Sequence, residues 1–79
     1  MNPKLVKQAV AYAAEFSEEN NGRIVVLING QNETTEVRPY CGESIRYEHL
    51  SNALTINLSE GKKFIDIDSV NSIHCYKQK

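Results

Sequence analysis

Two cysteines and two histidines are the residues of this chain best suited to metal binding: Cys41, His49, His74 and Cys75. Four such ligands are the number that a structural zinc site needs. Their spacing argues against zinc, because paired ligands usually stand about two to five residues apart and because neighbours on a strand point to opposite faces. We therefore predict no metal site. A Cys41–Cys75 disulfide stays open as the alternative to two reduced thiols.

A Cys–His nucleophile pair would combine Cys41 with His49 or His74 as the general base. Cys41 lies in a predicted turn beside Glu43, and a neighbouring carboxylate raises a thiol pKa instead of lowering it. A chain this short also has little room for a substrate pocket of roughly 300–1,000 Å3. We predict that the protein is not an enzyme and that it binds no cofactor and no small-molecule substrate.

Asp66, Asp68 and Asn71 have part of the spacing of a calcium loop. The glycine and the distal glutamate of such a loop are missing, so we interpret these residues as the polar outer face of a strand and a turn. The glycines stand singly at predicted turns, and no glycine-rich phosphate loop is expected.

Length and charge limit the remaining possibilities. The chain has 79 residues, nine basic and ten acidic, with a net charge of −1. These values predict one small domain, residues 1–79, with no overall field that would draw it to nucleic acid or to a membrane. The sequence contains neither a membrane-length apolar run nor the pattern of a signal peptide, so we expect a cytoplasmic protein.

The first residues predict an amphipathic helix over residues 3–19. Asn2 is a favoured N-cap, Pro3 suits the first turn, and Asn20-Asn21-Gly22 tolerates the conformations that end a helix. The apolar positions recur at three- and four-residue spacing, which places them on one face. They are Leu5, Val6, Ala9, Tyr12, Ala13 and Phe16.

From residue 23 the apolar period changes to two, which predicts a strand-rich region over residues 23–76 and a short basic tail over 77–79. Residues 23–28 suit a central strand, whereas Pro39 places the second strand at an edge. Ile65 and Ile67 are expected to point inward, as are Ile73 and Cys75. Turn signals roughly every eight to twelve residues favour an α+β fold, with about five short antiparallel strands in a small barrel or a strongly bent sheet.

The strand region resembles the Sm-like small β-barrels, which include Hfq and the YolD-like proteins. The matching stretches are Val26-x-Ile28-Asn29-Gly30, Leu54-x-Ile56-x-Leu58-x-x-Gly61 and Phe64-Ile65-x-Ile67-x-x-Val70-x-x-Ile73. The resemblance implies a small barrel that assembles into an oligomer and binds single-stranded RNA or DNA.

The RNA-contacting residues of that family are not matched. Glu48 and Asn52 have the spacing of its Asp–Asn pair, but the apolar residues that follow are one position out of register. Asp68-Ser69 stands where the family has Arg-Gly, and the Lys–His pair of Hfq is missing. The resemblance therefore covers the strand pattern and not the binding residues.

A nucleic-acid site would use Arg46, Tyr47, Lys62 and Lys63, because single-strand binders place aromatic side chains in a basic groove. Glutamates interleave with the basic residues of this part of the chain, and they weaken the positive potential that phosphates require. Nucleic-acid binding is the alternative hypothesis.

The hypothesis that we favour is a small non-enzymatic interaction or regulatory module that acts through an exposed edge strand. The 72–76 strand would present His74 and Tyr76 on its outer side, and Arg38 and Tyr40 flank the Pro39 segment. Unpaired main-chain groups at an edge form a template for another strand, supplied by a protein partner or a second copy. Compact chains of this kind are common among accessory or inhibitory proteins of mobile elements such as phages. That expectation rests on how common such proteins are and not on any residue of this chain.

Overall fold

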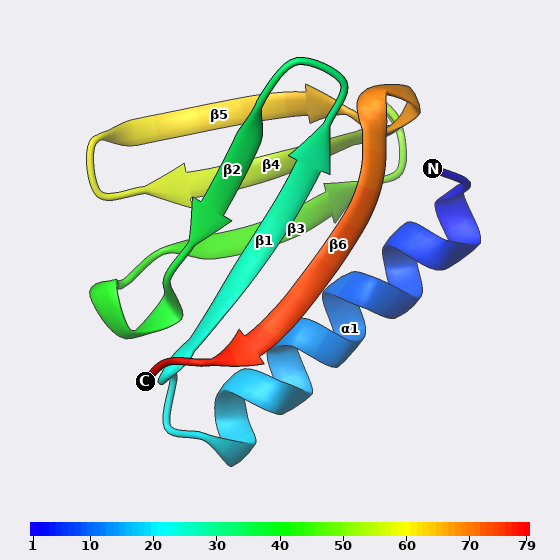
Figure 1. Ribbon diagram of the computed structural model, residues 1–79. Helices are drawn as coiled ribbons and strands as arrows, with labels where there is room; N and C mark the ends of the chain where they lie inside the picture. The colour runs from blue at the N-terminus through cyan, green and yellow to red at the C-terminus, as the bar shows by residue number, and fades with distance from the viewer.

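The computed structural model describes residues 1–79 as one α-helix, six strands and two single-turn 3-10 helices (Figure 1). The chain therefore has the α+β composition that its sequence predicts. The helix α1 spans Pro3–Glu19, and the 3-10 helices are η1, Pro39–Cys41, and η2, Ile67–Ser69. The strands are β1 Ile24–Gly30, β2 Thr34–Val37, β3 Ser44–Glu48, β4 Ala53–Leu58, β5 Gly61–Asp66 and β6 Val70–Lys77.

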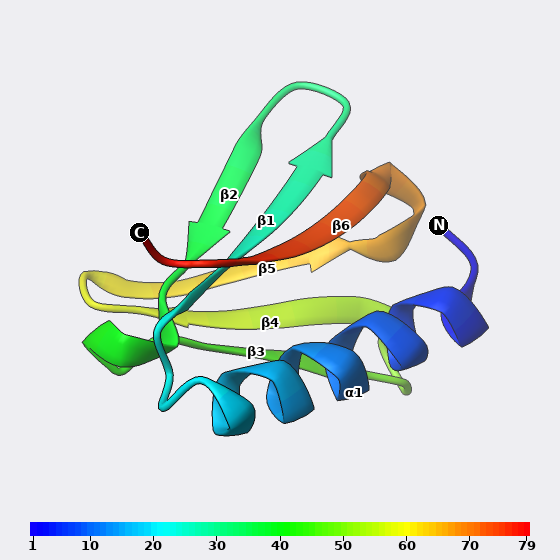
Figure 2. The same cartoon turned by 60° about the horizontal axis from the view of Figure 1, so that its bottom comes forward.

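The strands form two antiparallel three-stranded sheets. Sheet A has the order β2-β1-β6, and sheet B has the order β3-β4-β5. β1 is central in sheet A, as the sequence predicts, and β2 lies at its edge. Figure 2 shows sheet A crossing over sheet B, with α1 alongside β3 and below β6. No helix in the chain is both long enough and apolar enough to span a membrane.

The closed barrel that the sequence suggested is absent, and there are six strands instead of about five. Neither β2 and β3 nor β5 and β6 share a hydrogen-bonded ladder. Pro39 has no N–H to continue β2, so the chain turns through η1. At the other break, the Asp66 carboxylate accepts a bond from the N–H of Asp68 at 3.0 Å and begins η2. These two breaks keep the strands in separate sheets.

The helix begins and ends where its caps predict. The Asn2 side chain accepts a bond from the N–H of Leu5 at 2.9 Å, and Asn21 and Gly22 have the left-handed φ values of 55° and 78° that follow the last turn. Leu5 and Tyr12 are half exposed, which corrects the prediction that they face the core. The apolar stripe of α1 is narrower than expected because only one side of the helix packs against β3, β6 and β1.

The core lies between the two sheets and α1. It is built from one face of the helix and from alternate residues of the strands. The apolar residues that recur at every second position in the sequence are therefore the ones that point into the core. Fully burying a Leu, Ile or Val side chain stabilises a fold by about 1.5–3 kcal/mol. The core residues are Val6, Ala13, Ile24, Val26, Ile28, Val37, Leu54, Ile56, Ile67 and Val70.

Polar contacts also join the sheets. The Lys63 ammonium of β5 donates to the Thr35 hydroxyl of β2 at 2.9 Å and pairs with Glu33 at 3.0 Å. Thr35 is only 5% exposed and is the one buried polar residue, so this bond satisfies a hydroxyl that would otherwise be costly to bury. The Met1 amino group donates to the carbonyls of Ile67 and Val70, which ties the start of α1 to η2 and β6.

Candidate protein-interaction site

The outer face of sheet A carries His74 and Tyr76, as the sequence predicts. Their rings lie edge to face, with centroids 5.7 Å apart. The register places Tyr76 opposite Val25 and His74 opposite Leu27, which in turn lies opposite Glu36 of β2. The sequence did not assign Val25, Leu27 or Glu36 to this face, because doing so requires knowing which strands pair with β1. The result is an outer face on which the aromatic pair lies beside the partly exposed Leu27 and the buried Val25.

β6 is the edge of sheet A and pairs only with β1. Just beyond the end of β6, the N–H of Gln78 donates to the carbonyl of Arg23 at 2.9 Å. The main-chain groups of Gln78 therefore point toward β1. Because the direction of main-chain groups alternates along an antiparallel strand, the N–H and C=O groups of Ile73, Cys75 and Lys77 point away from β1. The free edge of β6 is therefore defined by these three residues.

Arg38 follows β2 in an extended conformation, on the same side of the chain as Glu36. Its guanidinium donates to the Glu36 carboxylate, and this neighbouring negative charge raises the pKa of Arg38. Tyr40 lies two residues further on in η1, with its side chain exposed. The structure thus places Arg38 on the outer face of sheet A with His74 and Tyr76, and places Tyr40 beyond the end of β2.

Glu43 holds the connection that carries Arg38 and Tyr40. One carboxylate oxygen accepts a bond from the N–H of Arg38 at 2.8 Å, and the other accepts bonds from the N–H and hydroxyl of Ser59 at 3.1 Å each. Partial burial alone would raise the pKa of Glu43, but these bonds outweigh it and the pKa is lowered. The carboxylate therefore fastens the β2–β3 connection to the β4–β5 turn.

The four residues of the nucleic-acid hypothesis do not share one surface. Arg46 and Lys62 lie on the outer face of sheet B, where Arg46 pairs with Glu48 at 3.6 Å. Tyr47 points to the other face, with the Lys7 ammonium of α1 5.9 Å from its ring centre and its hydroxyl donating to Asn52. The Lys63 side chain also points away from the outer face, and its ammonium is bonded to Thr35 and Glu33 of the same chain.

Phe64 is an exposed aromatic side chain that the sequence analysis did not assign to any surface. It is 69% exposed on the outer face of sheet B, opposite Thr55, which lies opposite Arg46. A signal was present, because Ile65 and Ile67 were expected to point inward and Phe64 must then point outward.

The cysteines and histidines do not form a chemical centre. Cys41 is exposed in η1 and Cys75 is half buried in β6, and both are free thiols. Burial raises the pKa of the Cys75 thiol, which keeps it protonated and unreactive. No three His, Cys, Asp or Glu side chains lie close enough together to hold a metal ion.

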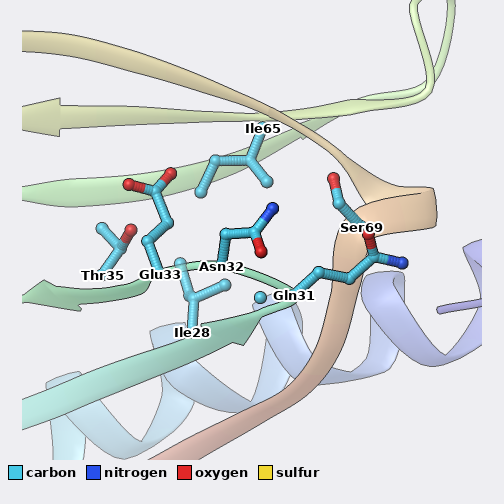
Figure 3. A pocket seen from close by; sticks show the side chains of 8 residues that line it. Ile28, Gln31, Asn32, Glu33, Thr35, Ile65 and Ser69 are labelled. Carbon is cyan, nitrogen blue, oxygen red and sulfur yellow. The ribbon is translucent and has the colours of Figure 1, made fainter.

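A polar hollow of about 240 Å3 lies between the β1–β2 turn, β5 and η2. Figure 3 shows the Asn32 amide and the Glu33 carboxylate standing between the hairpin and β5. Glu33 is the one ionisable group that lines the hollow, and it is already paired with Lys63, so no base and nucleophile meet there. The lining residues are Ile28, Gly30, Gln31, Asn32, Glu33, Thr35, Ile65 and Ser69.

Comparison of the chain with protein-family models, curated proteins and solved structures found no match. The geometry of its surfaces is therefore the basis for assigning it a function. Two features of sheet A coincide at one place, namely the open main-chain edge of β6 and the aromatic pair on its outer face.

Proposed function

We propose that the protein is a non-enzymatic interaction module that binds a partner polypeptide by adding a strand to the free edge of β6. The observation that carries this proposal is the row of outward-directed main-chain groups at Ile73, Cys75 and Lys77. Edge strands are usually short, bulged or covered, because an open one recruits other chains. β6 is the longest strand of the fold, with eight residues, and its register shift against β1 and its bond to the Met1 amino group are both confined to its first residues.

Side chains beside the edge supply specificity. An added strand would lie next to His74 and Tyr76, whose rings already pack against each other and lose little freedom on binding. Arg38 and Glu36 lie across the same face as a neutralised pair, so this face suits an amphipathic strand and not a highly charged one. Tyr40 is also a proposed contact residue, but it lies beyond the end of β2 and outside this face.

The Sm-like relationship is a further proposal about the fold. It is supported by the helix at the start of the chain and by the closing order of β4, a tight turn, β5, the one-turn η2 and β6, and six strands stand where the resemblance implies five. Nucleic-acid binding has weaker support, because the basic and aromatic candidates Arg46, Tyr47, Lys62 and Lys63 are divided between faces of sheet B.

The experiment that tests the proposal compares Lys77→Pro with Lys77→Ala. Proline removes an N–H on the free edge of β6 and leaves the ladder to β1 intact, whereas alanine removes the same side chain and keeps the N–H. Each variant is used as bait to capture partners from the source cells, with the wild-type chain as reference. We expect one partner to be retained by wild type and Lys77→Ala and weakened by Lys77→Pro. Equal retention by both variants, together with retention by Tyr76→Ala, contradicts the proposal.

A further inference from the structure

β5 is an edge strand of sheet B, on the side away from β3, and it lies near the top of Figure 1. It pairs only with β4, and the N–H of Ile67 donates to the carbonyl of Asn52 at 3.2 Å just beyond its end. By the same alternation that applies to β6, the main-chain groups of Lys62, Phe64 and Asp66 point away from β4. The Asp66 carbonyl accepts a bond from the Ser69 hydroxyl at 2.9 Å, so the groups left free at this edge are those of Lys62 and Phe64 and the N–H of Asp66.

The side chains of the same three residues all lie on the outer face of sheet B. They are a cation, Lys62, an exposed aromatic, Phe64, and an anion, Asp66, at two-residue spacing. Such a strand is complementary to itself when a second copy runs antiparallel to it. Lys62 then lies opposite the partner's Asp66, and the two Phe64 rings meet at the centre.

We propose that two copies of this chain associate through β5 about a two-fold axis at Phe64. The free main-chain groups of each β5 would bond to those of the other, which joins the two copies of sheet B into one continuous six-stranded sheet. This is an isologous contact, so both ion pairs and the aromatic contact arise from one patch that is used twice. Opposite charges directly across an antiparallel pair are favourable, and like charges there are unfavourable.

The charge pattern selects this register. A shift of two residues in one direction places Lys62 opposite the partner's Phe64 and loses both Lys62–Asp66 ion pairs. A shift in the other direction places Phe64 opposite the partner's Asp66 and moves Lys62 beyond the end of the partner's strand. Lys63 points to the opposite face and is held by Thr35 and Glu33 of its own chain, so it adds no repulsion.

The proposed dimer goes beyond the proposed function and does not depend on it. The contact uses sheet B alone, and it leaves the free edge of β6 in sheet A unoccupied in both copies. A dimer of this form would present two β6 edges and would bind partners bivalently.

Charge reversal across the two-fold axis tests the proposal. Light scattering after size-exclusion chromatography over a concentration series should give the wild-type chain twice its monomer mass. Lys62→Glu sets two pairs of carboxylates against each other and should weaken dimerisation roughly tenfold or more, as should Asp66→Lys. Mixing these two variants should restore a dimer, because both carboxylates of one chain then face lysines of the other.

Two controls separate dimerisation from folding and from the β6 site. Asp66→Asn keeps an acceptor for the N–H of Asp68 in η2 and removes only the charge, so it should weaken the dimer while leaving the melting temperature nearly unchanged. Lys77→Pro should leave the dimer unaffected, whatever its effect on partner binding. A wild-type chain that stays monomeric, or an oligomer that ignores Lys62→Glu and is not restored by mixing, overturns the proposal.

Discussion

At the scale of single residues, Glu43 is the side chain that does most to fix the irregular part of the chain. Its carboxylate accepts three hydrogen bonds from Arg38 and Ser59, which lie in two different connections. We predict that Glu43→Ala lowers the free energy of unfolding by about 1–3 kcal/mol, the range for losing bonds to a charged group. Urea denaturation measures this change. Glu36→Ala, which breaks an exposed ion pair, is the matched control and should cost less than about 1 kcal/mol.

The pH dependence of stability follows from the same residue. The pKa of Glu43 is lowered by folding, so its contribution is fully present above its ordinary value of 4.5 and is lost as the pH falls through the lowered pKa. Wild type should lose stability in this acidic range more steeply than Glu43→Gln, whose amide cannot titrate. Parallel acid profiles for the two proteins would contradict the assigned role of the carboxylate.

The Lys63–Thr35 bond gives a second prediction at this scale. Thr35→Val keeps the shape of the side chain and removes the hydroxyl that accepts from the Lys63 ammonium. We expect a loss of about 1 kcal/mol of unfolding free energy, since the ammonium keeps Glu33 as a partner. Thermal denaturation followed by circular dichroism measures this loss, and a more stable Thr35→Val protein would show that the bond between the sheets is not stabilising.

At the scale of elements, β6 combines a structural face with a binding face. Ile73 packs against the core, whereas Tyr76 lies on the outer side. Ile73→Lys should lower the free energy of unfolding by roughly 2–4 kcal/mol, because it brings an unpaired ammonium against apolar side chains. Tyr76→Ala should stay folded and lose partner binding. Circular dichroism and the capture experiment distinguish the two effects, and an unfolded Tyr76→Ala protein would contradict this division of faces.

The elements were predictable from the sequence where local chemistry determines them. Asn2, Pro3 and Gly22 set the ends of α1, and Pro39 marks the break after β2. The arrangement of the sheets was not predictable in this way. β6 pairs with β1 across more than forty residues of chain, and no local signal states which of several apolar strands will meet. The barrel expectation failed because Pro39 and the Asp66 cap interrupt the strands at η1 and η2.

The candidate sites show the same limit. The outward direction of His74 and Tyr76 followed from alternation alone. Alternation also predicts that the neighbours Lys62 and Lys63 point to opposite faces, so the division of the nucleic-acid set could have been recognised before the structure was known. The free edges could not have been recognised from the sequence, because they depend on which neighbouring strand pairs with each side of β5 and β6.

At the scale of the whole molecule, each sheet has one edge strand that we propose as a contact, β6 in sheet A and β5 in sheet B, on a fold with nearly balanced charge. We predict that the purified protein carries no nucleic acid. Because the chain has four tyrosines and no tryptophan, its own absorbance is weak and bound nucleic acid would be obvious at 260 nm. A ring-sized oligomer with excess absorbance at 260 nm that disappears at high salt would instead support the Sm-like nucleic-acid hypothesis.

The central claim is that β6 has an open edge that receives another strand, and residue-resolved amide hydrogen exchange tests it most directly. In the free protein, the amides of His74 and Tyr76 face β1 and should exchange slowly, whereas those of Ile73, Cys75 and Lys77 should exchange fast. In the complex with the captured partner, the fast amides should become protected and the slow ones should change little. Fast amides that stay fast in the complex, or no alternation in the free protein, would contradict the account.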